Sequence, residues 1–297
     1  MLGFLGGGRR EIVTLAIEDS DLRFLSVRGR VLKWGSVPLP KGLVTGGVIN
    51  DPLEMGRIVD ETFRENGLDR RRVISSVVGL RAIPRMLTMP KLQASMLEAA
   101  ISREAKKEMP VSLENLYLSW QSLPPEGDQQ RIYLLGVPRE MIDVQVRMLD
   151  AAGIQPLAMD LKPLALVRAV GQEQAVIINL EEGMLDIILV VEGLPAIMRT
   201  FGLDQREGSM EERIERLLTE LNQTMRFYND SHRNATIRPN TPVYASGRVL
   251  GQPEVLAYLR YASDRPIEQP PAPMPCPADL PVPDYLTNLG LALKQIA

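Results

Sequence analysis

The chain has almost none of the residues from which disulfide frameworks and metal centres are built. Its 297 residues include one cysteine, Cys276, and one histidine, His232. A single cysteine excludes an internal disulfide framework and a multi-cysteine zinc site, and it fits a reducing compartment. A single histidine excludes multi-histidine metal sites. Because His232 lies in a polar stretch at the end of an expected helix, where histidines are usually surface residues, we assign it no catalytic role.

The chain also lacks long apolar runs and an excess of charge of either sign. No run of about 18 apolar residues occurs, so the sequence encodes no transmembrane helix. The apolar part of residues 1–5 is too short for a secretory signal. The 34 basic and 37 acidic residues are interspersed and give a net charge of −3. This balance gives no electrostatic indication of nucleic-acid binding.

What the chain does contain is a repeated pattern. Residues 11–29 and 175–193 each consist of an apolar run, an acidic turn and a second apolar run. Each stretch predicts a strand–turn–strand unit, and their repetition predicts a duplicated fold in a chain long enough for two domains. Such paired hairpins hold nucleotide phosphates from two sides when their turns carry Asp and Gly.

The segment between the two hairpins predicts mixed α/β structure. A helix is expected to begin at Pro52 after the cap Asp51 and to end at Gly67, and residues 73–78 predict a buried strand. Residues 81–159 then predict the order β-α-β-β-α-β, a compact inserted subdomain that resembles the split βαβ pattern. Its expected strands are 81–89, 113–121, 131–137 and 154–159, and its expected helices are 92–108 and 138–153.

The second hairpin is followed by a long helix and a proline-rich stretch. Ser209 and Glu212 form a capping box, and apolar residues then recur at helical spacing through Tyr228. Eight prolines between Pro266 and Pro283 exclude a helix or a central strand and predict an extended connector. A ligand for a proline-binding partner is the alternative interpretation of this stretch. A terminal helix is expected to follow it.

Together these pieces resemble the type IV pilus assembly protein PilM family, actin-like relatives of the cell-division protein FtsA. The resemblance covers nearly the whole chain and depends on the order of several segments. These are residues 13–27, the blocks 137–140 and 149–154, Met159-Asp160 with 164–166, the helix segment 220–228, and residues 288–294.

The resemblance implies an α/β, actin-like (ribonuclease H-like) fold of two lobes with an inserted β-α-β-β-α-β subdomain. Residues 11–83 with 160–171 would form the first lobe, 84–159 the inserted subdomain, and 172–297 the second lobe with a Pro-rich loop at 265–283. It also implies a cytoplasmic protein at the inner face of the cell membrane, peripheral to it. There it would bind the N-terminal peptide of a PilN-like membrane protein, in a groove between the first lobe and the inserted subdomain. Self-association is left open.

In this family ATP lies between the lobes, and the first hairpin turn resembles Asp-Ile-Gly-Ser-Ser. In this chain Ala16 replaces the Asp and Glu18 replaces the Gly, while Ser20 and Arg23 keep the residue type. A carboxylate at residue 18, beside Asp19, would face a polyphosphate with like charge. The first turn therefore predicts weakened ATP binding.

The other two nucleotide turns are altered in the same way. In the second hairpin turn Asn179 and Glu181 replace Asp and Gly, and Gly183 keeps backbone freedom. The Ser-Gly-Gly of the adenosine turn is Ser-Gly247-Arg248 here, so a bulky side chain occupies a glycine position. Acidic Glu220 matches a family residue near the nucleotide.

We therefore expect ATP binding to be lost or severely weakened, with no catalytic residue, no metal ligand and no cofactor. If ATP with magnesium is bound after all, the residues expected to hold it are Ser20, Arg23, Asn179, Gly183, Glu220 and Gly247. The expected function is a PilM-like adaptor, a pseudo-ATPase, of a type IV pilus or type II secretion-like inner-membrane platform.

The main alternative to the adaptor is an active actin-like ATPase of the same assembly, in which Asn179, Glu18 or Glu181 organises the metal. Two further functions are less favoured. An FtsA-like division anchor is disfavoured because the sequence carries no amphipathic membrane helix after the terminal helix. A sugar kinase is disfavoured because no segment marks a carboxylate base.

Overall fold

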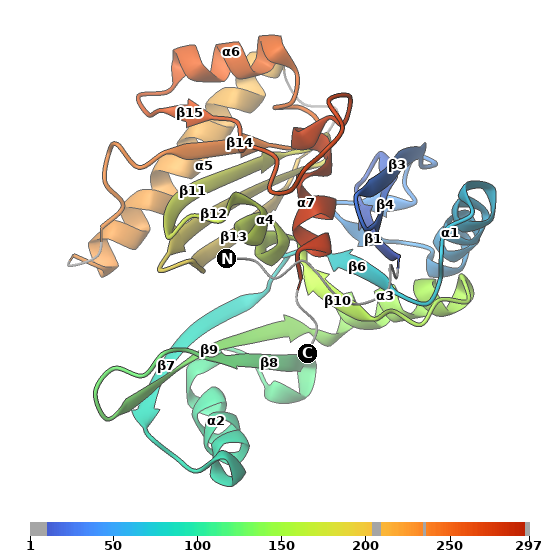
Figure 1. Ribbon diagram of the computed structural model, residues 1–297. Helices are drawn as coiled ribbons and strands as arrows, with labels where there is room; N and C mark the ends of the chain where they lie inside the picture. The colour runs from blue at the N-terminus through green and yellow to red at the C-terminus, as the bar shows by residue number, and fades with distance from the viewer. Residues whose placement is uncertain (1–10, 204–208, 234–235, 295–297) are drawn as a thin grey trace.

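Two lobes and a smaller third layer make up the protein (Figure 1). The computed structural model describes residues 11–203, 209–233 and 236–294. Within these residues each lobe contains a five-stranded sheet, and the third layer is a three-stranded sheet. Between Leu43 and Asn50 the chain also forms a two-stranded ribbon of β4 (Val44–Thr45) and β5 (Val48–Ile49).

The sheet of the first lobe has the order β10-β6-β1-β2-β3. Its strands are β1 (Ile12–Ile17), β2 (Asp21–Arg28), β3 (Val31–Pro38), β6 (Val73–Val77) and β10 (Ala158–Leu161). Helix α1 (Pro52–Asn66) begins where the carboxylate of Asp51 accepts hydrogen bonds from the N–H groups of Leu53 and Glu54. It ends at Gly67, whose φ of 61° is the left-handed conformation that glycine adopts without strain.

The sheet of the second lobe repeats the plan of the first. Its order is β13-β12-β11-β14-β15. In the first lobe β1 pairs antiparallel with β2 and parallel with β6, and in the second lobe β11 pairs antiparallel with β12 and parallel with β14. The strands are β11 (Gln174–Leu180), β12 (Met184–Val191), β13 (Leu194–Gly202), β14 (Val243–Ser246) and β15 (Ile267–Glu268). The duplication expected from the two hairpins is therefore present.

Two helices cover one face of the second sheet. They are α5 (Met210–Ser231) and α6 (Pro253–Ala262). The capping box of Ser209 and Glu212 is present, and the apolar stripe of α5 is buried against β11 and β12. His232 ends α5, is exposed, and stacks on the ring of Tyr228 at 4.3 Å between ring centroids.

The third layer contains β7 (Ile83–Pro90), β9 (Gln129–Pro138) and β8 (Leu116–Ser122), in the order β7-β9-β8. Helix α2 (Ala94–Glu108) packs against one face of this sheet through Leu97 and Ile101, and the short 3-10 helix η1 (Leu113–Asn115) precedes β8. The element order β-α-β-β-α-β is the expected one.

The last helix and strand of that order, however, do not pack with the three-stranded sheet. Helix α3 (Arg139–Ala151) lies against α1, and β10 pairs in parallel with β6. Met148 and Leu149 of α3 are fully buried with Met55 in the core of the first lobe. The physical reason is that α3 and β10 bury their apolar faces on α1 and β6. We expected α3 and the start of β10 in the inserted subdomain. Because of this packing, they belong to the first lobe.

Helices α4 (Lys162–Val170) and α7 (Val282–Ala292) lie between the two lobes (Figure 1). Helix α7 contacts β1 and β2 of the first lobe and β14 of the second. The two helices approach so closely that a Cβ on Gly290 would lie 1.9 Å from the carbonyl oxygen of Ala165. None of the helices formed by the described residues has the length and hydrophobicity needed to span a bilayer.

The proline-rich stretch forms a strap from the second lobe to the first. After β15 it passes over β2 and β3 and leads into α7. Met274, Cys276 and Leu280 turn inward against Leu25 and Trp34. The strap therefore adds an apolar contact between the lobes.

Candidate functional site

The turns of the two hairpins face each other at the boundary between the lobes. The carboxylate of Asp19, in the β1–β2 turn, accepts hydrogen bonds of 2.7 and 2.8 Å from the N–H groups of Gly46 and Gly47. The same carboxylate approaches the β11–β12 turn so closely that a Cβ on Gly183 would lie 2.1 Å from Asp19 Oδ2. The two turns are therefore in direct contact.

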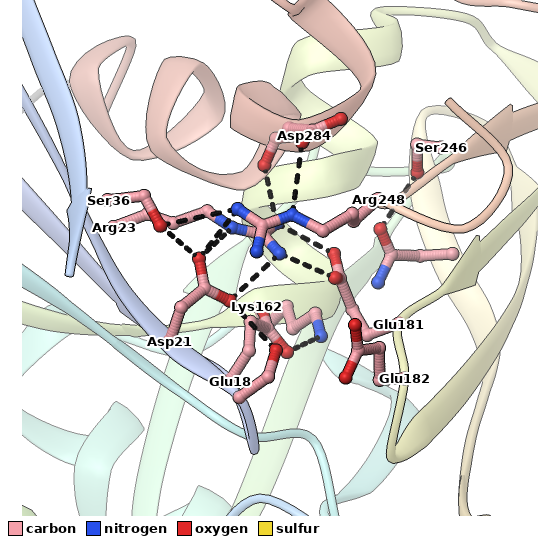
Figure 2. A network of polar contacts seen from close by, with 12 residues as sticks. Glu18, Asp21, Arg23, Ser36, Lys162, Glu181, Glu182, Ser246, Arg248 and Asp284 are labelled. Carbon is pink, nitrogen blue, oxygen red and sulfur yellow. Dashed lines mark hydrogen bonds and ion pairs between the residues drawn. The ribbon is translucent and has the colours of Figure 1, made fainter. Parts of the chain in front are cut away.

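Arg23 of β2 lies at the centre of this boundary and is buried (Figure 2). Its guanidinium donates to Glu181 at 2.9 and 2.7 Å, to Asp21 Oδ2 at 2.9 Å and to the carbonyl of Asp284 at 2.8 Å. Burial opposes the charge of Arg23, but the carboxylates of Glu181, Glu18 and Asp21 together outweigh burial and raise the pKa of the guanidinium. One side chain thus joins the first lobe, the second hairpin turn and the segment that begins α7.

A second buried cation, Lys162, occupies the first position of α4. Its Nζ lies 2.8 Å from Glu18 Oε2 and 3.2 Å from Asp186 Oδ2, so it joins the first hairpin turn to β12 of the second lobe. Burial raises the pKa of Glu18 from 4.5 to about 7, and the charge of Lys162 offsets part of this effect. Glu18 stands at a position where a family glycine was expected, and its carboxylate is used here as an ion-pair partner.

Arg248 reaches across the same boundary from the turn after β14. Its Nη2 lies 2.8 Å from Asp21 Oδ2, and its Nε lies 3.3 Å from Asp284 Oδ2. Ser36 of β3 also donates to Asp21 at 2.6 Å. Burial opposes ionisation of Asp21, but the hydrogen bonds from Arg23 and Ser36 and the charges of Arg23 and Arg248 together outweigh burial and lower the pKa of the carboxyl.

We call these eight side chains the cleft network. It comprises three cations and five carboxylates: Arg23, Lys162, Arg248, Glu18, Asp21, Glu181, Asp186 and Asp284. Three of its members, Glu18, Glu181 and Arg248, stand at the positions where the resemblance predicts glycine. Each side chain that replaces one of these glycines is therefore paired with a neighbouring charge of opposite sign. The parts of the chain that the structure describes contain no grouping of His, Cys, Asp or Glu suited to a metal ion.

Four of the residues expected to hold ATP lie at or beside the network. Arg23 belongs to it, and the hydroxyl of Ser20 donates to Asp21 at 3.2 Å. The amide of Asn179 donates to Asp186 at 3.3 Å, and its oxygen accepts from Ser246 at 3.0 Å. Gly183 packs directly against the carboxylate of Asp19, as described above. The structure therefore brings these residues together, but with protein partners.

The other two residues expected to hold ATP are Gly247, beside the second hairpin, and Glu220, outside the network. Gly247 has a φ of 91°, and a Cβ there would lie 2.4 Å from the carbonyl oxygen of Leu180, so only glycine fits beside the second hairpin. Glu220 lies on α5 outside the network, where its carboxylate is 3.7 Å from Arg199 of β13.

Sequence reasoning missed Lys162, Asp186 and Asp284. A signal was present for two of them. Asp186 is the single charge in the apolar strand Met184–Val191, and Lys162 begins an otherwise apolar helical turn. A lone charge in a buried element requires a partner of opposite sign, because an unpaired buried charge is costly. The sequence does not indicate which partner that is.

A groove of about 950 Å³ lies between the three-stranded sheet and the first lobe, and residues 193–195 of the second lobe border it at one end. One wall consists of Tyr117 to Gln121 of β8 with Tyr133 of β9, and the other includes Met159 of β10 with Leu164 and Arg168 of α4. The hydroxyl of Tyr133 donates to the carbonyl of Pro195 in the second lobe at 3.1 Å. The lining is largely apolar and aromatic, as in sites that bind peptides or small molecules.

The duplicated hairpin sheets, the helices between them and the inserted layer define an actin-like protein. A Bacteroides thetaiotaomicron protein with an actin-like ATPase fold superposes with a TM-score of 0.51 at 10% identity, covering 97% of each chain. The structure of a PilM–PilN type IV pilus biogenesis complex gives a TM-score of 0.70 at 20% identity, over 96% of this chain and 98% of the other. The cytoplasmic domain of EpsL, an inner-membrane component of the type II secretion system of Vibrio cholerae, gives 0.53 at 13% identity, over 96% and 97%. These likenesses confirm the expected fold.

The sequence comparison identifies the family within this class. The profile of the type IV pilus assembly protein PilM family matches residues 26–192, which is more than half of the chain. The chain belongs to this family, as the resemblance predicted. A comparison with curated protein sequences gave no match.

Proposed function

We propose that this PilM family protein is an adaptor that works without bound ATP. In this proposal it lies in the cytoplasm, peripheral to the inner face of the membrane, in a type IV pilus or type II secretion-like platform. It binds the N-terminal peptide of a PilN-like membrane protein in the groove between the three-stranded sheet and the first lobe. The observation that carries the proposal is the cleft network, three members of which stand at the positions where the resemblance predicts glycines of the ATP site.

The cleft network opposes ATP through both space and charge. The side chains of Glu18, Glu181 and Arg248 fill positions where glycines would let a nucleotide approach the backbone. A triphosphate would also have to separate the 2.7 Å pair of Arg23 and Glu181, leaving a carboxylate buried without its partner. Breaking one partner of a buried pair costs about 3–5 kcal/mol, which weakens an affinity by about two to four orders of magnitude.

The groove supports the peptide part of the proposal. It presents aromatic and aliphatic side chains, including exposed Tyr117, and it runs beside an edge strand of a sheet. Extended peptides commonly bind such edges. The solved structure with a TM-score of 0.70 is described as a complex of PilM with PilN, which supports the choice of partner.

An active ATPase is disfavoured as the alternative function. It would need Glu18, Asn179 or Glu181 to organise magnesium. Glu18 is paired with Lys162, Glu181 with Arg23, and Asn179 is hydrogen-bonded to two neighbouring side chains. In a phosphate-release assay we expect no activity that depends on these residues. Activity that disappears in Asn179→Ala and Glu181→Ala would support the alternative.

Two binding experiments test the proposal. In calorimetric titrations with magnesium and ATP up to about 1 mM, we expect no binding. Binding of ATP with a sub-micromolar dissociation constant would overturn the proposal that the protein works without bound ATP.

The second experiment uses the N-terminal peptide of a PilN-like protein from the same organism. We expect the peptide to bind wild type and Met96→Asp, a change on the exposed side of α2, but not Leu164→Asp in the groove. If the peptide fails to bind folded wild-type protein, the adaptor function is wrong in this form.

A further inference from the structure

We propose that the peptide bound in the groove forms an additional strand on the outer edge of β8 and brings a carboxylate to Arg168 and Lys294. This inference rests on the proposed function, since it specifies how the groove recognises its partner. It names the partner's chemistry as an extended segment with alternating apolar residues and one acidic residue among them.

The first observation is the orientation of the β8 backbone. Strand β8 is an edge strand, because β9 lies on only one side of it. The N–H of Leu123 donates to the carbonyl of Arg131, and this position is in register with the β8–β9 ladder. Hydrogen-bonded pairs alternate along an antiparallel ladder, so the backbone groups of Tyr117, Ser119 and Gln121 face β9. The N–H and C=O groups of Leu118 and Trp120 consequently face away from β9.

The second observation is that this free edge borders the groove. All five consecutive residues from Tyr117 to Gln121 line the cavity, although successive side chains of a strand point to opposite faces. The side chains of Tyr117, Ser119 and Gln121 lie on the groove face, opposite Val137, Leu135 and Tyr133 of β9. Leu118 and Trp120 point their side chains to the α2 face, so they border the groove with their backbone. An extended chain would satisfy these unpaired groups.

The third observation is an imbalance of charge in the groove wall. The buried carboxylate of Asp160 is shared by two cations, Arg168 Nη2 at 2.8 Å and Lys294 Nζ at 3.2 Å. The other carboxylate of the lining, Glu173, is exposed and forms no ion pair with either cation within the described residues. A peptide that covers the groove removes water from the second cation. A carboxylate on the peptide restores the balance, because a desolvated charge needs a partner.

The chemistry of the partner follows from these three observations. Every second side chain of an added strand faces the apolar wall that includes Met159, Leu164 and Val167. Among these inward side chains, the one beside Arg168 and Lys294 is Asp or Glu.

The test begins with a phage-displayed library of random dodecapeptides, selected on the whole protein. From the peptides that do not bind Leu164→Asp, the tightest is synthesised with single N-methyl groups along its backbone. We expect methylation to weaken binding by about tenfold or more at every second position, where the N–H bonds to β8, and by less than about threefold between them. A scan without a period of two, or a selection that yields no groove-binding peptide, overturns the proposal.

A matched pair of variants tests the same edge from the protein side. Trp120→Ala and Trp120→Pro both remove the indole, but only proline removes the outward N–H, and proline is tolerated on edge strands. We expect Trp120→Pro to bind the peptide at least about tenfold more weakly than Trp120→Ala. Thr88→Pro, on the outer edge of β7, is the control and should bind as wild type. Equal affinities of the two Trp120 variants contradict the proposal, and the N-methyl scan decides if Trp120→Pro does not fold.

The carboxylate is tested with Lys294→Met, which leaves Arg168 in place. This variant should bind the acidic peptide about tenfold more weakly than wild type does, but bind its Asn or Gln counterpart equally well. Equal losses of affinity for both peptides overturn the charge assignment.

The outcomes also separate this inference from the proposed function. If the PilN-like peptide binds in the groove but its N-methyl scan shows no period of two, only the inference fails. If selected peptides show the period and the PilN-like peptide does not bind, only the proposed partner fails.

Discussion

The guanidinium of Arg23 and the carboxylate of Glu181 form two parallel hydrogen bonds, of 2.9 and 2.7 Å, between residues 158 positions apart in the chain. Both side chains are almost completely buried, at 1% and 4% exposure. Glu181 replaces an expected glycine of the phosphate-binding turn. The residue that replaces this expected glycine therefore supplies the partner of Arg23.

Removal of Arg23 should destabilise the protein strongly. Arg23→Met leaves Asp21 and Glu181 buried without their main cation, so we expect the free energy of unfolding to fall by about 3–5 kcal/mol. Urea unfolding measures the change. The control is Arg57→Met, which breaks a solvent-exposed pair with Glu54 on α1 and should leave the unfolding midpoint unchanged. Similar midpoints for the two variants would contradict a structural role for the network.

Glu18 should make stability depend on pH near neutrality. Its pKa in the folded protein is raised from 4.5 to about 7, chiefly by burial. The folded chain then holds the proton more tightly than the unfolded chain, so this contribution to stability is complete below the unfolded pKa and is lost as pH rises through about 7.

Glu18→Gln tests this dependence, because it removes the titrating group. Between about pH 5 and pH 8 we expect wild type to lose up to about 3 kcal/mol of stability that the variant does not lose. Urea unfolding at intervals across this range measures both slopes. Parallel slopes for the two proteins would show that Glu18 does not titrate in this window.

The contact between the hairpin turns should not tolerate a methyl group. A Cβ on Gly183 would lie 2.1 Å from Asp19 Oδ2, and Asp19 is held by two backbone N–H groups. We expect Gly183→Ala to cost about 1–3 kcal/mol in thermal or urea unfolding. Gly202→Ala is the matched control, since its Cβ would meet no atom nearer than 3.9 Å, and it should change stability by less than about 0.5 kcal/mol. Equal effects would place the two turns further apart than described.

Restoring one family glycine should not restore nucleotide binding. Arg248→Gly frees space beside Gly247, but Glu18 and Glu181 still occupy the hairpin turns. We therefore expect titrations of Arg248→Gly with magnesium and ATP to show no binding up to about 1 mM. Sub-millimolar binding to this variant would mean that Arg248 alone blocks the site.

The duplicated fold could be predicted from the sequence because its signals are local. The alternating apolar runs of the two hairpins, the Asp51 cap of α1 and the capping box at Ser209 each lie within a few residues, and the structure contains all of them. The placement of β10 beside β6 could not be predicted in this way. A short apolar strand shows by its pattern that it is buried, but not which strand it pairs with.

The sequence could predict that the two hairpin turns meet, but it could not predict which side chains of the cleft network pair with each other. The sequence predicted that the turns of the two hairpins face each other, and it included Arg23 among the residues expected to hold ATP if ATP is bound. Its actual partner Glu181 is 158 residues away, and Lys162 is 144 residues from Glu18. Such pairs form only when the lobes come together, so no local pattern of residue types encodes them.

The proline-rich strap has a consequence for the unfolded chain. Proline restricts the backbone before folding begins, so a segment with eight prolines between residues 266 and 283 loses less conformational entropy when it becomes ordered. The strap therefore ties the second lobe to β2 and β3 at a low entropic cost. Its inward contacts are mainly apolar, through Met274 and Leu280, and do not titrate with acid. At a pH where Glu18 changes its charge, the strap continues to hold the two lobes together.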